Sequence, residues 1–363
     1  MEWEKLDWNA LDRLREGFLS GSAARGVYWR SLSDLENYDL TYGERIGWKW
    51  DAVLNELIRR GWRPHVVAAT PADTEPSSAS PAPTDQPLST SEKLTVLDWG
   101  CGSGVAGRRV IEAFGADKLS TLLVWDHSQL ARAFAMQAAK KRFPKLMVGE
   151  LRDDSRFDLL VVSHVLNELS DQSRAELLAL VRRAHFVLWV EPGTHAVSRD
   201  LIGIRETLRD EFQMVAPCTH SQRCGLLALE NTQHWCHYFA SPPAAIYADS
   251  DWVKFGQRAG IDLRSLPYSF LVAERIDPLR SAGPTTDAAR IVGEPRHYKG
   301  FAKLLSCDPT GVTDLMLQKR DDPTLYKALK RDRGVPIYRW TRDGDRIKQA
   351  QPLFPEPPTP DFS

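Results

Sequence analysis

Hydrophobic positions along the chain follow two different periods. In residues 1–68 they recur at helical spacing, most clearly at Ile46, Trp50 and Val53, which predicts amphipathic helices whose apolar face needs a partner. In residues 92–280, short apolar runs alternate with longer helical stretches: LTVLDW, LLVWD, DLLVVSHV, FVLWVE and YSFLVAERI. This alternation predicts an α/β domain in which helices cover both faces of a parallel sheet.

Other segments depart from both patterns. Residues 69–91 are rich in Pro, Ser, Thr and Ala and lack any apolar period, so we expect a flexible linker and a domain boundary there. In the module 281–350, GFAKLLSC and TDLMLQK flank the turn Asp308–Gly311, which predicts a β-hairpin followed by a short helix near 325–331. The tail 351–363 carries five prolines and is expected to be disordered.

Composition narrows the class of protein. The 363 residues are 42% hydrophobic and 26% charged, as in soluble globular proteins with one large or two modest cores. A net charge of -1 excludes a uniformly basic nucleic-acid coat, but residues 296–350 hold 13 Lys and Arg against 7 Asp and so carry +6. Apolar runs are far shorter than a membrane span, and the acidic start MEWEKLDW differs from a signal or transit peptide. We therefore expect a cytoplasmic protein with no membrane partner.

A glycine-rich turn directly follows the first apolar strand. Gly100, Gly102 and Gly104 in DWGCGSG separate that strand from a helix, where the backbone can approach a ligand closely. Asp126 ends the next strand, 22 residues after Gly104, from where a carboxylate can accept both hydroxyls of a ribose. A tight structural turn is the alternative for the glycines alone, but the two features together predict a cofactor site.

Asp-x-Gly-x-Gly-x-Gly resembles the S-adenosylmethionine loop of the seven-stranded methyltransferases. FDLLVVSHVLNEL (157–169) and VEPGT (190–194) resemble the fourth strand with its lip and the end of the fifth strand. The resemblance implies a Rossmann-like seven-stranded methyltransferase core, with Asp98 facing the methionine ammonium of the cofactor. The implied cofactor-binding residues are Asp98, Gly100, Cys101, Gly102, Gly104 and Asp126.

No sequence motif identifies the residues for the chemical step as clearly as the glycine loop identifies the cofactor site. The Asn/Asp-Pro-Pro-aromatic lip that serves exocyclic amino methylation is replaced by SHVLNEL. Four side chains could position or deprotonate an acceptor, and each is as readily explained as a helix cap or a cofactor contact: His164, Asn167, Glu168 and Glu191.

Cysteines cluster in a stretch after the fifth strand, the predicted insertion 216–240. Cys218, Cys224 and Cys236 lie within 19 residues of one another. Any one could be an inert buried residue, but three in one loop-like insertion favour metal ligation by zinc or an iron–sulfur cluster. A fourth ligand is then required. Cys307 is the candidate, with His220 or His237 as competitors.

In their joint order these motifs resemble the small-ribosomal-subunit Rsm family, also called methyltransferase-like protein seventeen. The motifs are LDWGCGSG, SHVLNEL, VEPGT, APC…C…WCH, SFLVAER and KGFAKLLSC. The resemblance implies a protein that binds the small ribosomal subunit and its RNA during assembly. It also implies a four-iron cluster on Cys218, Cys224, Cys236 and Cys307. Where the family has Cys-Pro, this chain has Cys224-Gly225, which leaves the implied ligands intact.

The leading hypothesis is therefore a ribosome-assembly protein that contacts 16S-type rRNA through basic residues of the C-terminal module. These are Lys299, Lys303, Lys319, Arg320, Lys327, Lys330 and Arg331; a solvated basic face is the alternative for each of them. The second hypothesis is an active rRNA methyltransferase, and the third a small-molecule methyltransferase with a structural zinc. DNA is not an expected partner.

Overall fold

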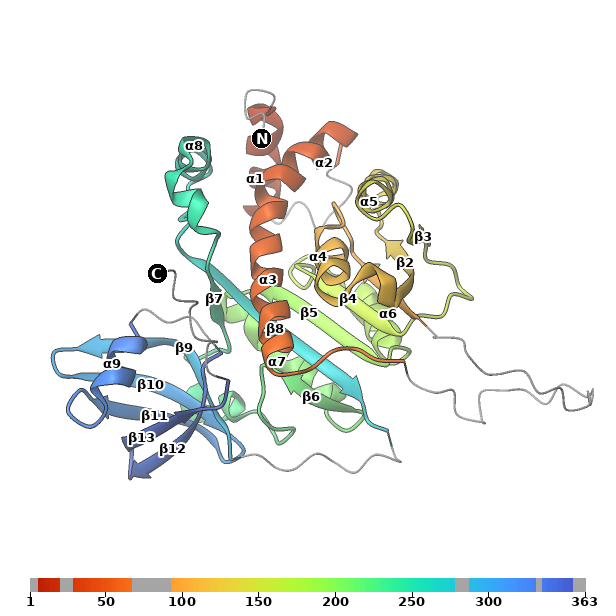
Figure 1. The fold of residues 1–363 in the computed structure, drawn as a ribbon. Coiled ribbons are helices and arrows are strands. Elements are labelled where there is room, and N and C mark those ends of the chain that lie inside the picture. Colours follow the sequence, from red (N-terminus) through yellow and green to blue (C-terminus); the bar gives the residue numbers. More distant parts are fainter. Residues whose placement is uncertain (1–5, 20–28, 67–92, 278–286, 331–334, 355–363) are drawn as a thin grey trace, which may run out of the picture.

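The computed structural model describes residues 6–19, 29–66, 93–277, 287–330 and 335–354. Its ribbon has three parts: N-terminal helices, a large sheet between layers of helices, and a small β-barrel (Figure 1). The predicted linker 69–91 lies outside the described residues.

The N-terminal segment is helical, as predicted. Its elements are α1 (Trp8–Leu19), α2 (Leu32–Tyr38), the π-helical turn η3 (Asp39–Gly43) and α3 (Glu44–Arg59). Helix α2 begins at an N-cap, since the Ser31 hydroxyl accepts a hydrogen bond from the Asp34 amide at 3.2 Å. Helix α3 buries Trp50, Val53 and Leu57 completely, as its apolar period predicts.

Strands and helices alternate through the central domain. They are β1 (Leu94–Trp99), α4 (Val105–Phe114), β2 (Leu119–Trp125), α5 (Gln129–Arg142), β3 (Met147–Glu150), β4 (Leu159–Ser163), α6 (Asp171–Val181), β5 (Phe186–Pro192), α7 (His195–Leu208), β6 (Phe212–Ala216), β7 (Tyr238–Ala240), α8 (Ser250–Ala259) and β8 (Leu266–Arg275).

The strand order β3-β2-β1-β4-β5-β8-β6 confirms the predicted seven-stranded, Rossmann-like methyltransferase core. Strands β1 to β5 pair in parallel, whereas β8 runs antiparallel to β5 and β6. An eighth strand, β7, pairs with the start of β8. It was not predicted, because three residues after Cys236 are too few to show a period.

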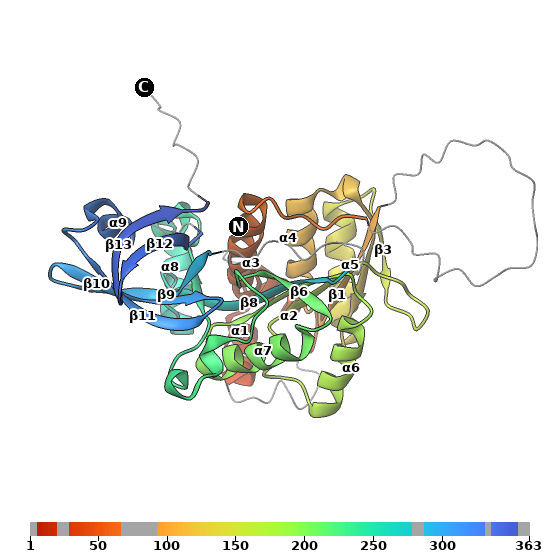
Figure 2. The same cartoon turned by 90° about the horizontal axis from the view of Figure 1, so that it is seen from below.

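Both faces of the sheet are buried. Along β4, Leu159 and Val161 join one hydrophobic cluster, while Leu160 and Val162 join the other. Figure 2 shows α3 and α4 on one side of the sheet and α6 and α7 on the opposite side. This arrangement explains why the strand residues read as continuous apolar runs rather than as an alternating pattern.

Helix α3 belongs to the same core as the sheet. Trp50, Val53 and Leu57 cluster with Val110 of α4 and Leu188 of β5. The residues on the two sides of the expected domain boundary at 69–91 therefore share one core, and the apolar face of the N-terminal segment finds its partner there.

The C-terminal module is a closed barrel rather than a hairpin. The predicted hairpin is present as β10 (Phe301–Asp308) and β11 (Gly311–Gln318). The other elements are β9 (Ala289–Tyr298), α9 (Pro323–Ala328), β12 (Ile337–Asp343) and β13 (Arg346–Pro352), and the strands close in the order β10-β11-β13-β12-β9. The core contains Ala302, Leu304, Leu315, Leu317 and Ile347.

The expectation of a hairpin was incomplete, because the barrel has three further strands. Strand β9 was missed because Gly293 and Pro295 interrupt its apolar pattern, and β13 because only Ile347 of its residues is fully buried. Gln351 and Pro352, the first two residues of the expected tail, pair with β12. Residues 355–363 lie outside the described residues.

A buried ion pair joins the barrel to α3. Arg290 of β9 donates to both carboxylate oxygens of Glu56, at 2.5 and 2.8 Å, and to the Pro217 carbonyl at 3.1 Å. The guanidinium also lies 4.1 Å from the ring centroid of Tyr238. Arg60 donates to Glu56 from the next turn of α3, at 3.2 Å. Because both partners are at most 6% exposed, neither charge has water as an alternative partner.

We expect Glu56→Ala to lower the free energy of unfolding by about 3–5 kcal/mol, because it leaves the Arg290 charge buried without its partner. Asp12→Ala is the matched control: it breaks the exposed Arg258–Asp12 pair, which should cost at most about 1 kcal/mol. Urea unfolding of both variants measures the difference. Equal losses would show that the buried pair does not hold the barrel to the helix.

The difference should also depend on pH. Burial alone would raise the pKa of Glu56, but the guanidiniums of Arg290 and Arg60 hold it below its usual value. The stabilisation is thus present above the unfolded pKa of this carboxyl and is lost as the pH falls through the lower, folded pKa.

Candidate cofactor pocket and cysteine site

A cavity of about 510 Å³ opens at the carboxyl ends of the parallel strands. Trp99 ends β1, Trp125 ends β2 and Ser163 ends β4, and all three line it. Open α/β sheets bind their ligands at this edge, and the volume is typical of a small-molecule site.

The glycine loop forms one wall of the cavity. Gly100 and Gly104 have φ values of 69° and 76°, which side-chain-bearing residues rarely adopt. A Cβ on Gly100 would lie 2.7 Å from the Cγ1 atom of Val165, and a Cβ on Gly104 would lie 2.8 Å from the Cβ atom of Ala135. Both positions therefore need glycine for conformation and for close packing, and at Gly100 this leaves the backbone facing the cavity.

Asp126 lies where the strand pattern predicted it, at the cavity edge after β2. Its carboxylate accepts hydrogen bonds from the Gly102 amide at 3.0 Å and the Ser128 amide at 2.8 Å. One oxygen thus holds the glycine loop and the other holds the start of α5. Since a carboxylate has about four acceptor sites, each oxygen can still accept a ligand hydroxyl.

Asp98 does not line the cavity. It is fully buried, and its carboxylate accepts a hydrogen bond from the Gly107 amide in α4 at 3.0 Å. Side chains alternate along β1, so Asp98 points to the α4 side of the sheet. Gly104, another predicted cofactor-binding residue, is also absent from the cavity lining. Burial raises the pKa of Asp98 to about 7, and its Oδ1 atom has no hydrogen-bond partner among the residues that the structure describes. Asp98 therefore lies behind the glycine loop, and its contact with a cofactor ammonium stays a prediction. Gly100, Cys101, Gly102 and Asp126 do line the cavity.

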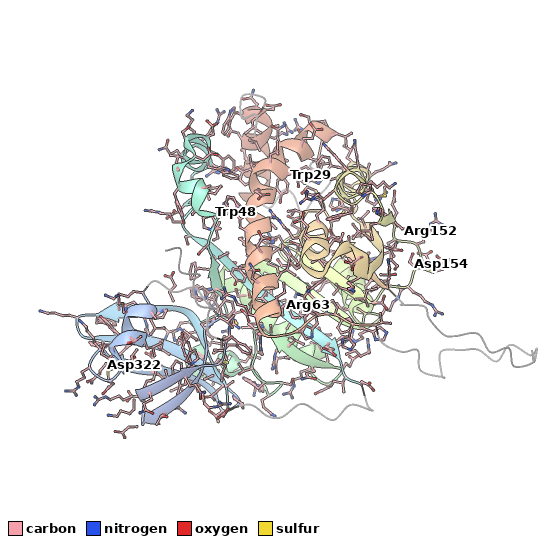
Figure 3. The ribbon with its side chains drawn as sticks, in the orientation of Figure 1. Trp29, Trp48, Arg63, Arg152, Asp154 and Asp322 are labelled. Atoms are coloured by element: carbon pink, nitrogen blue, oxygen red, sulfur yellow. The ribbon has the colours of Figure 1, made fainter. Side chains whose placement is uncertain are left out.

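The opposite wall comes from the N-terminal helices, which the sequence analysis did not connect with the site. Its residues are Trp29, Tyr38, Tyr42, Arg45, Ile46 and Lys49. Trp29, labelled in Figure 3, packs against Ala131 of α5. One signal was present in the sequence: Lys49 lies three residues after Ile46 and four before Val53, so it interrupts an apolar helix face.

Lys49 contacts the lip, the segment 164–169 that follows β4. Its Nζ atom lies 3.2 Å from the Nε2 atom of His164, and the neighbouring Trp50 donates to the Ser163 hydroxyl at 2.9 Å. Burial and the nearby Arg45 charge lower the pKa of Lys49 to about 7. Burial and the Lys49 charge likewise keep the pKa of His164 well below its usual value. This pair can therefore hold and release a proton near neutral pH.

The lip has an unusual backbone conformation. His164 is the one non-glycine residue with positive φ (56°) in the described part of the chain. Glu191 braces the lip from behind, where its carboxylate accepts from the Val165 and Leu166 amides and from the Trp189 indole. A strained residue held by surrounding bonds is characteristic of functional sites.

The four candidates for the chemical step differ in their position relative to the cavity. His164, Asn167 and Glu168 line the cavity, whereas Glu191 is fully buried behind the lip. Burial and the Asp126 charge raise the pKa of Glu168 to about 7. Burial also raises the pKa of Glu191 to about 7, but its three hydrogen bonds give it a positioning role.

The four predicted ligand cysteines converge between β6 and the barrel. Cys224, Cys236 and Cys307 share one hydrophobic cluster with Leu226 and Val292. All are free thiols. Burial, with the nearby Cys218 charge, raises the pKa of Cys224 to about 11 and of Cys236 to about 12. The charges of the other three cysteines also raise the pKa of Cys307, after burial as the main cause.

The histidine competitors differ in position. The Nε2 atom of His220 lies 3.8 Å from the Cys307 sulfur, whereas His237 stacks on Trp235 with ring centroids 4.5 Å apart. Among the residues that the structure describes, no three His, Cys, Asp or Glu side chains are arranged to share one metal ion. The cysteines are therefore neighbours, but they do not form a closed single-ion cage.

The family model described as mitochondrial small ribosomal subunit Rsm22 matches residues 92–336, a range that includes the cavity loop and all four cysteines. The chain belongs to the Rsm22 family. The resemblance stated from the sequence motifs is thereby confirmed. No curated protein matches the chain.

Several solved methyltransferase structures are similar to this Rsm22-family protein. Magnesium protoporphyrin IX methyltransferase from Synechocystis is 14% identical with a TM-score of 0.36, over 74% of this chain and 95% of that one. TrmK of M. capricolum is 9% identical with a TM-score of 0.30, over 52% of this chain and 66% of that one.

The predicted RNA-contacting residues all come from the barrel module. Lys299 is in the β9–β10 turn, Lys303 in β10, Lys319 and Arg320 after β11, and Lys327 and Lys330 in and after α9. These six are exposed, and none forms a salt bridge within the described ranges, although Lys330 lies over the Tyr326 ring. Arg331 lies outside the described residues.

The helices of this Rsm22-family protein carry no sign of a membrane span. Within the described ranges, none is both long and apolar enough to cross a bilayer.

Proposed function

We propose that this Rsm22-family protein is an assembly or translation factor of the small ribosomal subunit that binds its rRNA through the basic barrel. The family match over residues 92–336 carries the proposal. The six exposed cations of the barrel support it, because cations that form no salt bridge within the described residues can neutralise phosphates. The family name refers to mitochondria, whereas the sequence led us to expect the cytoplasm; small ribosomal subunits occur in both compartments.

The cavity is the proposed site of S-adenosylmethionine. The backbone of Gly100 to Gly102 would lie against the ligand, Asp126 would accept its ribose hydroxyls, and the aromatic wall from Trp29, Tyr38 and Tyr42 would enclose it. When bound, this cofactor supplies an activated methyl group.

We propose a four-iron cluster, rather than zinc, at Cys218, Cys224, Cys236 and Cys307. A single zinc ion needs four ligands at about 2.0–2.3 Å around one point, and no such grouping exists among the described residues. In a cluster each cysteine binds a different iron, so the sulfurs stand further apart. The four cysteines that such a cluster needs lie near one another. The cluster would connect the insertion to β10, because Cys307 lies on that strand.

Methyl transfer to rRNA is the second candidate function, and the Lys49–His164 pair favours it. Near pH 7 the Nζ atom of Lys49 can take up a proton from an acceptor in the cavity, since burial lowers its pKa to about 7. A group of matched pKa at the operating pH is what proton transfer requires.

Cofactor binding is tested by Asp126→Asn. Losing a charged acceptor for two hydroxyls should weaken S-adenosylmethionine binding about 10- to 150-fold, as measured by isothermal titration calorimetry. Asp117→Asn, which changes an exposed carboxylate away from the cavity, should bind like the wild type. If both variants bind equally well, Asp126 is not a ribose ligand.

A methyl-transfer assay with the wild-type protein and Lys49→Met separates the assembly role from methyl transfer to rRNA. With labelled S-adenosylmethionine and small subunits from a strain lacking the protein, an active enzyme should transfer label at a rate that rises through about pH 7 and is lost in Lys49→Met. Binding without transfer at any pH supports the assembly role alone.

The cysteine site is tested by anaerobic purification and analysis for iron, sulfide and zinc. A four-iron cluster predicts about four irons and four sulfides per chain, with loss of iron in Cys307→Ser. Cys101→Ser is the matched control, because Cys101 is the fifth cysteine and lies in the glycine loop, and it should keep the metal. Stoichiometric zinc, or unchanged iron in Cys307→Ser, would contradict the assignment.

RNA binding by the barrel is tested through its salt dependence. The affinity for small-subunit rRNA should fall steeply with salt, and Lys319→Ala or Lys327→Ala should each reduce the slope of log K against log salt by about 1. Lys145→Ala removes an exposed lysine from the loop before β3, an edge strand of the large sheet, and should leave the slope unchanged. A salt-independent signal would rule out phosphate contacts by these lysines.

A further inference from the structure

The barrel has the topology of an oligonucleotide-binding (OB) fold. Taken in chain order, its five strands β9 to β13 close as first-second-third-fifth-fourth, since β9 pairs with both β10 and β12. Helix α9 lies between the third and fourth strands, and the third and fifth strands, β11 and β13, are parallel. In this fold the face of the second and third strands binds oligonucleotides or oligosaccharides. Here these strands are β10 and β11.

One end of that face is already occupied by this chain. Leu305 and Cys307 of β10 and Val312 of β11 pack against the cysteine insertion, in a cluster with Leu226. The approach is close, because a Cβ on Gly225 would lie 2.6 Å from the Val312 amide nitrogen. A ligand can therefore use only the other end of the face.

The open end carries a pair of stacked aromatic rings. Tyr298 of β9 lies opposite Phe301 of β10 in the strand register, and their ring centroids are 4.7 Å apart with the planes 11° from parallel. Tyr298 is 46% exposed, which is unusual for a large aromatic side chain. Helix α9 fixes the strand beneath it, since the Tyr326 hydroxyl donates to the Tyr298 carbonyl at 2.7 Å.

Cations without salt-bridge partners surround this pair. Lys299 lies in the turn between the two aromatic residues, Lys303 follows on β10, and the Lys319 amide donates to the Gly300 carbonyl at 2.9 Å. None of the three lysines forms a salt bridge within the described part of the chain, whereas Arg296 on the same face is paired with Asp314 at 2.6 Å. Positive charge beside a stacking surface favours a polyanion with flat bases over a neutral sugar chain.

We propose that Tyr298 and Phe301, with Lys299, Lys303 and Lys319, form a binding site for single-stranded RNA, in which unpaired bases stack on the aromatic pair and the lysines contact the flanking phosphates. The choice of RNA rests on the proposed ribosomal function. The site goes beyond that function because it requires unpaired bases, which a purely electrostatic contact with rRNA does not.

The test measures fluorescence anisotropy of the full-length protein with a labelled RNA of about 12 nucleotides, as a single strand, as a duplex of the same length and as the matching DNA strand. Single-stranded RNA should bind more tightly than the duplex. Tyr298→Ala and Phe301→Ala should each weaken single-strand binding about 5- to 150-fold, the effect of losing one stacked base.

Two further variants isolate stacking from folding. Tyr298→Phe keeps the ring and should bind like the wild type, and Tyr247→Ala removes an equally exposed tyrosine outside the barrel and should change nothing. Equal binding of strand and duplex, insensitive to Tyr298→Ala, would overturn the site even if the salt slope upheld the ribosomal function. A preference for the DNA strand would overturn RNA as its ligand. Stacking on the RNA strand without any affinity for small-subunit rRNA would uphold the site and contradict the ribosomal function.

Discussion

The buried pair between Arg290 and Glu56 is the interaction on which the arrangement of the whole molecule depends. It joins a strand of the barrel to helix α3, and the same guanidinium donates to the Pro217 carbonyl, one residue before Cys218 of the cysteine insertion. Arg60 adds a bond from α3 to the Cys218 carbonyl at 3.2 Å. Because an unpaired buried charge is costly, the barrel, the cysteine insertion and α3 can be buried together only in this relative position.

Helix α3 consequently links two sites that are far apart in the sequence. Lys49 faces the cavity and Glu56 faces the cysteine region, and seven residues of helix separate them by about 10 Å. Any shift of α3 along its axis would move Lys49 relative to His164 and Glu56 relative to Arg290 at the same time. The cavity wall and the barrel are therefore positioned by one rigid element.

The sequence predicted those parts of the fold that local patterns encode. The alternation of strands and helices, the glycine loop and the place of Asp126 after the second strand follow from apolar runs and from residues at fixed offsets, and the structure contains all of them. The seven-stranded core was implied by the family resemblance. Strand β9 was not predictable in this way, because its buried residues include Arg290, whose partner Glu56 is 234 positions away. Lys49 was missed for the same reason: its proximity to His164 is a tertiary contact between segments separated by the predicted linker. The position of Asp98 behind the loop likewise depends on the packing of Gly107, which the motif does not specify.

Charge and packing together decide which surface of the barrel can meet a polyanion. The whole chain carries -1 while residues 296–350 carry +6, so the remainder carries -7, and a polyanion attracts the barrel and repels the core. On the barrel, the cysteine insertion covers the Cys307 end of the β10–β11 face with apolar contacts. Attraction therefore draws RNA to the uncovered end, where Tyr298 is exposed. The insertion that carries the cysteines thus also limits where on the barrel RNA can bind.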